Sequence, residues 1–260
     1  MDSTEATSGR SGWNLSALVI CQLSAILLLG SWCYGPTRAL WDRLDHAVFS
    51  LLNGSLDGPE WWRTIWAVTN WRPFDLVPAL ITVGIFVVFI CAGRRQHLVQ
   101  RAAAGLVVAL FILLVRKLAN LDILEIDRKS PSRAVDSAIR LAKEFHWIGF
   151  KDSSTRSFPG DHSLFLIMLA VFFWYYGGLA FGLVYCGVTL LFSLPRMVVG
   201  AHWLTDNLVG AGFIALVSMS ILLATPLHRV LAALAEPTVR KVLGRFERQA
   251  AAEQNDSPAG

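Results

Sequence analysis

Long apolar runs alternate with polar segments along the chain. Six stretches are nearly free of charge, near residues 13–34, 74–93, 99–115, 159–176, 179–195 and 207–225. Because a straight helix needs about 20 residues to cross a hydrocarbon core, each run is long enough to cross or nearly cross a bilayer. The pattern therefore predicts an all-α fold, a polytopic membrane helical bundle with about six transmembrane helices.

The connecting segments differ in character. Residues 35–73 place apolar side chains at helical spacing, which predicts an amphipathic helix at the membrane interface. Residues 116–158 form the longest polar loop and hold nine of the 23 Lys and Arg residues. Residues 226–260 predict a basic amphipathic helix that ends in a disordered-looking tail, AAEQNDSPAG. We expect one membrane catalytic domain over residues 1–225, followed by a cytoplasmic basic tail.

Composition agrees with a protein dissolved in lipid, since 54% of the residues are hydrophobic and 16% are charged. Soluble domains carry about 25% charged residues. The net charge of +4, with no basic stripe interleaved with aromatics, indicates no nucleic-acid partner. The four cysteines show no paired spacing, so we expect small apolar residues and not a metal site or disulfide framework. The polar start lacks a basic segment and a cleavage site, so the first apolar run is expected to stay as a membrane helix.

Basic residues favour one orientation. Arg94, Arg95 and Arg101 flank the loop between the second and third predicted spans, and a second basic group follows the last span. With six spans and a cytoplasmic start, both groups lie in the cytoplasm, as the positive-inside rule favours. The loop 116–158 then faces the opposite side. Its nine positive charges count against this orientation unless several of them serve a site.

Two polar clusters stand at the ends of apolar runs, where ionisable residues are costly and are functional candidates by default. The first is the run from Ser157 to His162, and the second extends from Arg196 to Asp206. One continuous helix between them would be about 50 Å long, which exceeds a hydrocarbon core of about 30 Å. Gly177-Gly178 supplies a break. We therefore expect a two-span hairpin that brings both clusters to the same membrane face.

The residue types in these clusters fit phosphoryl transfer. His202 and Asp206 are four residues apart, which places both side chains on one face of a helix. A carboxylate there holds one imidazole nitrogen protonated and leaves the other free as a nucleophile. Arg196 offers a planar fork for phosphate oxygens. His162 offers a proton and, near a Pro-Gly helix start, anion-binding amides. Together they indicate in-line displacement on phosphorus with no metal or other cofactor.

The alternative is that the two histidines are solvated interfacial residues and that Asp206 caps a helix. For a single histidine that alternative would be preferred. The convergence of four polar residues on one face of an apolar chain favours a site. The other four histidines lack such partners and are expected to be interfacial: His46, His97, His146 and His228.

At these residues the chain resembles the type 2 phosphatidic acid phosphatase superfamily. Its signatures are K-x6-R-P, P-S-G-H and S-R-x5-H-x3-D. The third is matched in full spacing by Arg196, His202 and Asp206, with Pro195 in place of the usual serine. The resemblance implies a catalytic core like that of the phosphatidic acid phosphatases and haloperoxidases, with His202, His162 and Asp206 as the catalytic residues.

The other two signatures are altered. The second reads P-G-D-H at 159–162, so Gly-Asp replaces Ser-Gly. The first reads R-K-S-P at 128–131, with no lysine at the expected distance, so Lys117, Lys129 or both are candidates to stand in. A carboxylate at Asp161 should repel an anionic substrate unless it is protonated or paired, for example with Arg156. The resemblance implies these phosphate-binding residues: Arg196, Arg128, Lys129, Lys117, Gly160 and Asp161.

The combination S-F-P-G-D-H, P-R-x3-G-A-H-W-x-T-D and R-x-S-P is similar to a narrower branch, the bacterial lipid A 1-diphosphate synthases. Its members are inner-membrane phosphotransferases with a periplasmic site. This resemblance implies that His202 attacks the terminal phosphorus of undecaprenyl pyrophosphate and that His162 protonates the departing undecaprenyl phosphate. The 1-phosphate of lipid A then accepts the phosphoryl group, with membrane lipids as the surrounding medium.

Two alternatives stay open at this point. A phosphatase that resolves the phosphohistidine with water shares every named residue, and undecaprenyl pyrophosphate or another lipid phosphate would be its substrate. A non-enzymatic lipid transporter or scaffold belongs to a different class. That class leaves the His-Asp spacing and the converging charges unexplained.

Overall fold

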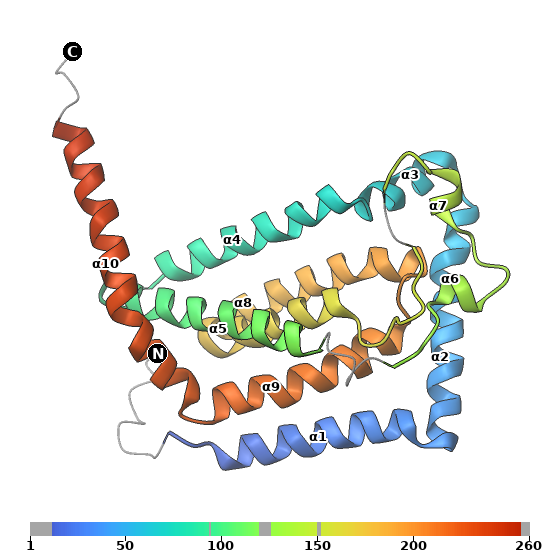
Figure 1. Ribbon diagram of the computed structural model, residues 1–260, viewed down its shortest axis with the longest axis horizontal. Helices are drawn as coiled ribbons and strands as arrows, with labels where there is room; N and C mark the ends of the chain where they lie inside the picture. Colours follow the sequence, from blue (N-terminus) through green and yellow to red (C-terminus); the bar gives the residue numbers. More distant parts are fainter. Residues whose placement is uncertain (1–11, 94, 120–125, 150–151, 256–260) are drawn as a thin grey trace.

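A computed structural model describes residues 12–93, 95–119, 126–149 and 152–255, and these fold as an all-α bundle (Figure 1). Within the described residues the one departure from helix and loop is an isolated bridge between Ile126 and Phe158. The helices are α1 (Leu15–Cys33), α2 (Gly35–Gly54), α3 (Glu60–Thr69), α4 (Leu76–Cys91), α5 (Leu98–Ala119), α6 (Pro131–Ala134), α7 (Leu141–Glu144), α8 (Asp161–Val198), α9 (Gly212–Ala224) and α10 (Leu227–Asn255). Short helical turns span Ser55–Asp57, Arg72–Asp75, Arg95–His97 and, as a π-helix, Asp206–Ala211.

Among the residues that the structure describes, five helical segments are long and apolar enough to cross a membrane: Leu15–Cys33, Arg72–Cys91, Leu98–Ala119, Asp161–Val198 and Asp206–Ala224. The longest of them is broken at Gly178, where φ is 75° and ψ is −165°. A positive φ of this size is open to glycine at little cost. The break thus divides α8 into two halves, as the sequence predicted, and the bundle has about six transmembrane helices.

The two halves of α8 lie side by side as an antiparallel hairpin (Figure 1). Ser163 Oγ and Ser193 Oγ lie 3.0 Å apart, within hydrogen-bond distance, near the cavity end of the hairpin. Further along, Thr189 Oγ1 donates to the Leu166 carbonyl at 3.2 Å. These contacts join residues 30 and 23 positions apart in the sequence, and they fix the register of the hairpin. The start and the end of α8 therefore lie at the same end of the bundle.

Aromatic packing fills the core between α4, α5, α8 and α9. Phe172 and Phe173, on the first half of α8, are fully buried and contact Phe86 and Phe89 of α4. Burial of large apolar side chains is the main stabilising contribution in a water-soluble core, whereas close packing carries more of it in lipid. The outer faces of α1 and α4 are apolar and exposed, as lipid-facing surfaces are.

Two helices run across the ends of the bundle (Figure 1). At one end, α2 crosses with α3, α6 and α7 beside it, which fits the interfacial helix predicted within 35–73. At the other end, the start of α1 meets the end of α9, since the Asn14 N–H donates to the Ala224 carbonyl at 2.7 Å. The basic helix α10 crosses this second end and packs against α5.

The C-terminal segment differs from the expectation in one respect. Residues 251–255 were expected to be disordered, but α10 continues through Asn255, while 256–260 lie outside the described residues. A run of Ala, Glu and Gln has high helix propensity, and this favours continuation of the helix. Of the basic residues used for the orientation, Arg94 also lies outside the described residues.

Candidate active site

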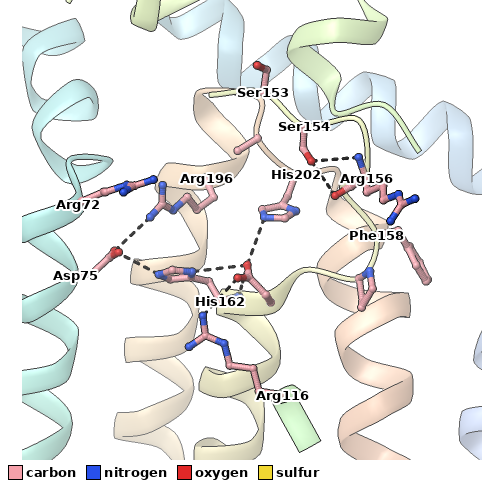
Figure 2. A pocket seen from close by; sticks show the side chains of 13 residues that line it. Arg72, Asp75, Arg116, Ser153, Ser154, Arg156, Phe158, His162, Arg196 and His202 are labelled. Atoms are coloured by element: carbon pink, nitrogen blue, oxygen red, sulfur yellow. Dashed lines mark hydrogen bonds and ion pairs between the residues drawn. The ribbon is translucent and has the colours of Figure 1, made fainter. Parts of the chain in front are cut away.

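A cavity of about 480 Å³ lies at the α2 end of the bundle, where both ends of α8 meet the start of α4 and the end of α5 (Figure 2). It brings together four predicted site residues: Asp161, His162, Arg196 and His202. The convergence predicted from the hairpin is thus present in the structure. The lining residues are Arg72, Asp75, Arg116, Ser153, Ser154, Arg156, Phe158, Pro159, Asp161, His162, Arg196, Ala201 and His202.

The turn after α8 places the predicted nucleophile beside Arg196. Gly200 has a φ of 78°, and its N–H donates to the Met197 carbonyl at 3.2 Å. The Ala201 N–H donates to the Arg196 carbonyl at 2.9 Å. This pair of bonds around a left-handed glycine is a Schellman motif, which ends a helix and turns the chain back. The next N–H, that of His202, also reaches the Arg196 carbonyl at 3.3 Å.

The imidazole of His202 is held by a backbone carbonyl. Its Nδ1 lies 2.9 Å from the Ser157 carbonyl oxygen and 3.7 Å from Asp206 Oδ2. Since a carbonyl only accepts, Nδ1 carries the hydrogen, and Nε2 of the neutral ring holds the free lone pair. Nε2 faces Asp161, whose Oδ1 is 3.8 Å away.

The helical-spacing argument for His202 and Asp206 was wrong in its geometry. His202 lies in the turn before the helix, and only residues from Leu204 onward are helical. Asp206 approaches the histidine because its Oδ2 accepts the Trp203 N–H at 2.7 Å. This is the backward half of a capping box, in which the third helical residue satisfies the N-cap amide. Helix capping and orientation of the imidazole are therefore served by one carboxylate.

The pKa of His202 is set by opposing effects. Partial burial lowers the pKa because the charged ring loses hydration, while the carboxylates of Asp206 and Asp161 and the Ser157 carbonyl raise it. The net pKa lies above the ordinary histidine value. A neutral nucleophile at His202 is therefore populated only at a pH above this raised pKa.

His162 sits at the start of α8 between two carboxylates (Figure 2). Its Nε2 lies 3.2 Å from Asp75 Oδ1, and its Nδ1 lies 3.7 Å from Asp161 Oδ1. The same Asp75 oxygen accepts from Arg196 Nη2 at 3.2 Å. Asp75 thus joins the predicted acid to the predicted phosphate-binding arginine.

Asp161 is balanced by Arg116, at the end of α5. Asp161 Oδ2 lies 3.6 Å from Arg116 Nη2. The suggested partner Arg156 instead pairs with Asp127 at 3.0 Å. The Coulomb attraction of the arginine and of the flanking histidines explains how a carboxylate is tolerated beside an anion site.

Gly160 links the two ends of the active site. Its N–H donates to the Asp206 carbonyl at 2.9 Å. A Cβ at this position would collide with the side-chain oxygen of Asn207. This contact gives a physical reason for glycine where the superfamily usually has serine. The His162 N–H donates to Asp161 Oδ1 at 2.8 Å. The Gly160 and His162 amides were expected to bind an anion, but both donate to protein groups in the structure.

Arg128 lies behind the cavity and does not line it. Its Nη1 donates to Asp206 Oδ1 at 2.6 Å and its Nη2 to Asp45 Oδ2 at 2.6 Å. The two candidate lysines are exposed and are also absent from the lining: Lys117, next to the cavity residue Arg116, and Lys129. The structure therefore does not bring these three expected phosphate ligands to the cavity.

Comparison with known proteins agrees with this site. The PAP2 superfamily model matches residues 126–229. The lipid A 1-diphosphate synthase of Escherichia coli (strain K12) is 29% identical over 218 residues, which cover 82% of this chain and 90% of that relative. The part of the chain that carries both predicted histidines therefore resembles the PAP2 superfamily. No solved structure gives a significant match.

The matches to the PAP2 superfamily and to this relative indicate an enzyme, a lipid phosphatase or phosphotransferase that requires no metal, and the apolar helices indicate a multi-pass membrane protein. Within the described part of the chain, no group of three or more His, Cys, Asp and Glu side chains is arranged to hold a metal ion. The matched range contains the turn after α8 and both predicted histidines.

Three charged cavity residues escaped the sequence analysis, and all precede the PAP2 match: Arg72, Asp75 and Arg116. A usable signal was present for Arg116, because a charged residue in the last turn of an apolar span is costly without a role. Arg72 and Asp75 looked like an ordinary polar boundary before a span. Their place in the site depends on how α4 packs beside α8.

Proposed function

We propose that the protein transfers the terminal phosphate of undecaprenyl pyrophosphate to the 1-phosphate of lipid A through a phosphohistidine at His202. The observation that carries the proposal is the 2.9 Å contact between His202 Nδ1 and the Ser157 carbonyl. This contact fixes the tautomer and leaves Nε2 facing the cavity as the nucleophile. The relative named lipid A 1-diphosphate synthase supports the choice of substrates.

In the first step, His202 Nε2 forms a bond to the terminal phosphorus while the bond from that phosphorus to the bridging oxygen breaks. His162 gives its proton to this oxygen, and undecaprenyl phosphate leaves. Arg196, Arg116 and Arg72 line the cavity and stabilise the negative charge on the equatorial oxygens. To bind phosphate, Arg196 and Arg116 exchange their contacts with Asp75 and Asp161 for phosphate oxygens.

In the second step, an oxygen of the lipid A 1-phosphate attacks the phosphorus and the N–P bond breaks, which returns the lone pair to His202 Nε2. A phosphate oxyanion is already deprotonated, so this acceptor needs no base, and His162 regains its proton from solvent. Water as acceptor would need His162 to remove a proton. The phosphatase alternative therefore uses the same residues, but it requires His162 to act as a base in the second step, whereas transfer to lipid A does not.

We place the protein in the bacterial inner membrane with the cavity facing the periplasm. The start of α1 and the basic helix α10 lie at the end of the bundle opposite the cavity (Figure 1). The positive-inside rule favours that end in the cytoplasm. This arrangement supports the orientation inferred from the charges.

The test uses purified protein in detergent with terminally labelled undecaprenyl pyrophosphate, with and without lipid A. Label on lipid A, with little free phosphate, is expected. Free phosphate released at equal rates with and without lipid A would refute transfer in favour of hydrolysis. His202→Ala should abolish turnover and labelled phosphoenzyme while the apparent melting temperature is retained. Full turnover in that variant would exclude the phosphohistidine.

A further inference from the structure

Two carboxylates and one guanidinium lie behind the turn after α8, on the side of His202 that faces away from the cavity. Asp45 of α2 and Asp206 are both almost fully buried, with exposed fractions of 1% and 0%. The guanidinium of Arg128 bridges them at 2.6 Å on each side. Thr205 donates its N–H and its hydroxyl to Asp45, at 2.9 and 2.6 Å. The group is fully hydrogen-bonded, as buried charges must be.

This cluster contacts the proposed nucleophile through one atom. Asp206 uses Oδ1 for Arg128 and directs Oδ2 to the Trp203 N–H and toward His202 Nδ1, at 3.7 Å. The Arg128 guanidinium also stacks on the Trp203 ring, 5.3 Å from its centroid. The negative charge that Asp206 presents to His202 therefore depends on how strongly Arg128 is also attracted to Asp45.

Stability alone gives little reason for such a cluster, because a buried ion pair is often no more stable than apolar residues of the same volume. The charge balance suggests another role. Asp45 and Asp206 together share one cation, so the cluster keeps one negative charge. If Arg128 had only Asp206 as a partner, the attraction between that carboxylate and a cationic imidazole would be largely cancelled.

We infer that Asp45 is a positioning residue that acts through Arg128 on the Asp206 carboxylate and thereby on His202. The interfacial helix α2 is in this way coupled to the nucleophile. The inference rests on the proposed function, because it takes His202 as the attacking group. In the phosphorylated intermediate the imidazole ring carries positive charge, and the negative charge retained by Asp206 stabilises it.

Other charged groups face these residues. Asp161 and the two arginines Arg196 and Arg116 act on the cavity side of His202 and are unchanged by substitutions on α2. Asp42, one turn before Asp45, lies 3.9 Å from Arg128 Nη2, but it is exposed and also paired with Arg38. The ring of His46 lies 5.0 Å from that of Trp203. Asp42 provides the matched control, because its charge is close to Arg128 and screened by water.

The experiment measures the pH profiles of kcat and kcat/KM for the transfer reaction in the full-length protein. In Asp45→Asn, Arg128 neutralises Asp206 alone and the pKa of His202 falls, so the acid limb of kcat/KM moves to lower pH by about 0.5–1 unit. The plateau value of kcat should fall about 3- to 10-fold, with KM nearly unchanged. Asp42→Asn should leave both profiles as in the wild type.

A second variant keeps the inference testable if Asp45→Asn folds poorly. Asp45→Asn combined with Arg128→Gln removes one charge of each sign and leaves Asp206 unneutralised, so the acid limb should move back to higher pH. An unshifted limb in a folded Asp45→Asn protein, or equal shifts in the Asp45 and Asp42 variants, would overturn the inference. Activity in His202→Ala measured alongside would instead overturn the proposed function.

Discussion

Replacing Gly160 with alanine should disturb the contact that holds the two ends of the active site together. The new Cβ would collide with the Asn207 side-chain oxygen and lie 3.3 Å from the Asp206 carbonyl. Asn207 has little freedom to move, since its oxygen accepts from Ser163 Oγ at 2.7 Å and its Nδ2 donates to the Trp203 carbonyl at 3.1 Å. The segment before α8 must therefore move away from the turn that carries His202.

The size of the effect follows from these contacts. Overpacking of a rigid site costs about 1–3 kcal/mol, and rotation of the buried amide away from a hydrogen-bond partner costs a further 1–3 kcal/mol, roughly. We expect destabilisation by about 2–6 kcal/mol, or a drop of about 4–24 °C in the apparent melting temperature. Because Gly160 directly precedes Asp161 and His162, kcat should also fall by about 10- to 100-fold.

A double-mutant cycle with thermal melting and turnover assays isolates this contact. Asn207→Ala alone should destabilise, because it removes two buried hydrogen bonds. In that background, Gly160→Ala should cost at least about 1 kcal/mol less than in the wild type. Gly187→Ala is the matched control, since a Cβ there meets no atom within 4 Å on a helix of ordinary φ. Wild-type melting and turnover in Gly160→Ala, or strict additivity in the cycle, would refute the reasoning.

Three further predictions concern neighbouring residues. Gly200→Ala must place a side chain at a φ of 78°, which costs about 1–2 kcal/mol, and should lower both melting temperature and turnover; unchanged values would contradict the role of the Schellman turn. Asp75→Asn should lower kcat about 10-fold with a smaller change in KM, because the 3.2 Å contacts of Asp75 with His162 and Arg196 weaken. A larger effect on KM than on kcat would indicate that Asp75 acts in substrate binding and not in proton transfer by His162. The kcat/KM of the wild type should rise with pH through an apparent pKa above 6.5, since the raised pKa of His202 keeps its ring protonated below that point; a flat profile from pH 6 to 8 would contradict it.

Much of the fold followed from the sequence because lipid imposes a simple constraint. A span needs about 20 apolar residues, and a 38-residue helix is too long for one crossing. Gly178 therefore had to mark a turn. The meeting of His162 with Arg196 followed from that hairpin alone. Residues whose placement depends on local chain length and glycine conformation were within reach of sequence reasoning.

The parts that were missed depend on packing between distant elements. Asp75 enters the site because the start of α4 lies beside both ends of α8, and no local pattern specifies that neighbour. The spacing of His202 and Asp206 suggested a shared helix face, whereas the chain forms a turn and a cap there. A four-residue spacing is compatible with both geometries. The Schellman glycine at position 200 is the sequence feature that distinguishes them.

The departures from the superfamily signatures form one compensating set. Asn207 occupies the space of a side chain at position 160, so glycine is required there. Asp161 adds a negative charge beside His202, and Arg116 from α5 pairs with it at 3.6 Å. Arg128 does not line the cavity and lies between Asp45 and Asp206. Asp161 and Arg116 therefore pair with each other on the cavity side of His202, while the arginine of the altered first signature holds the Asp206 carboxylate from behind.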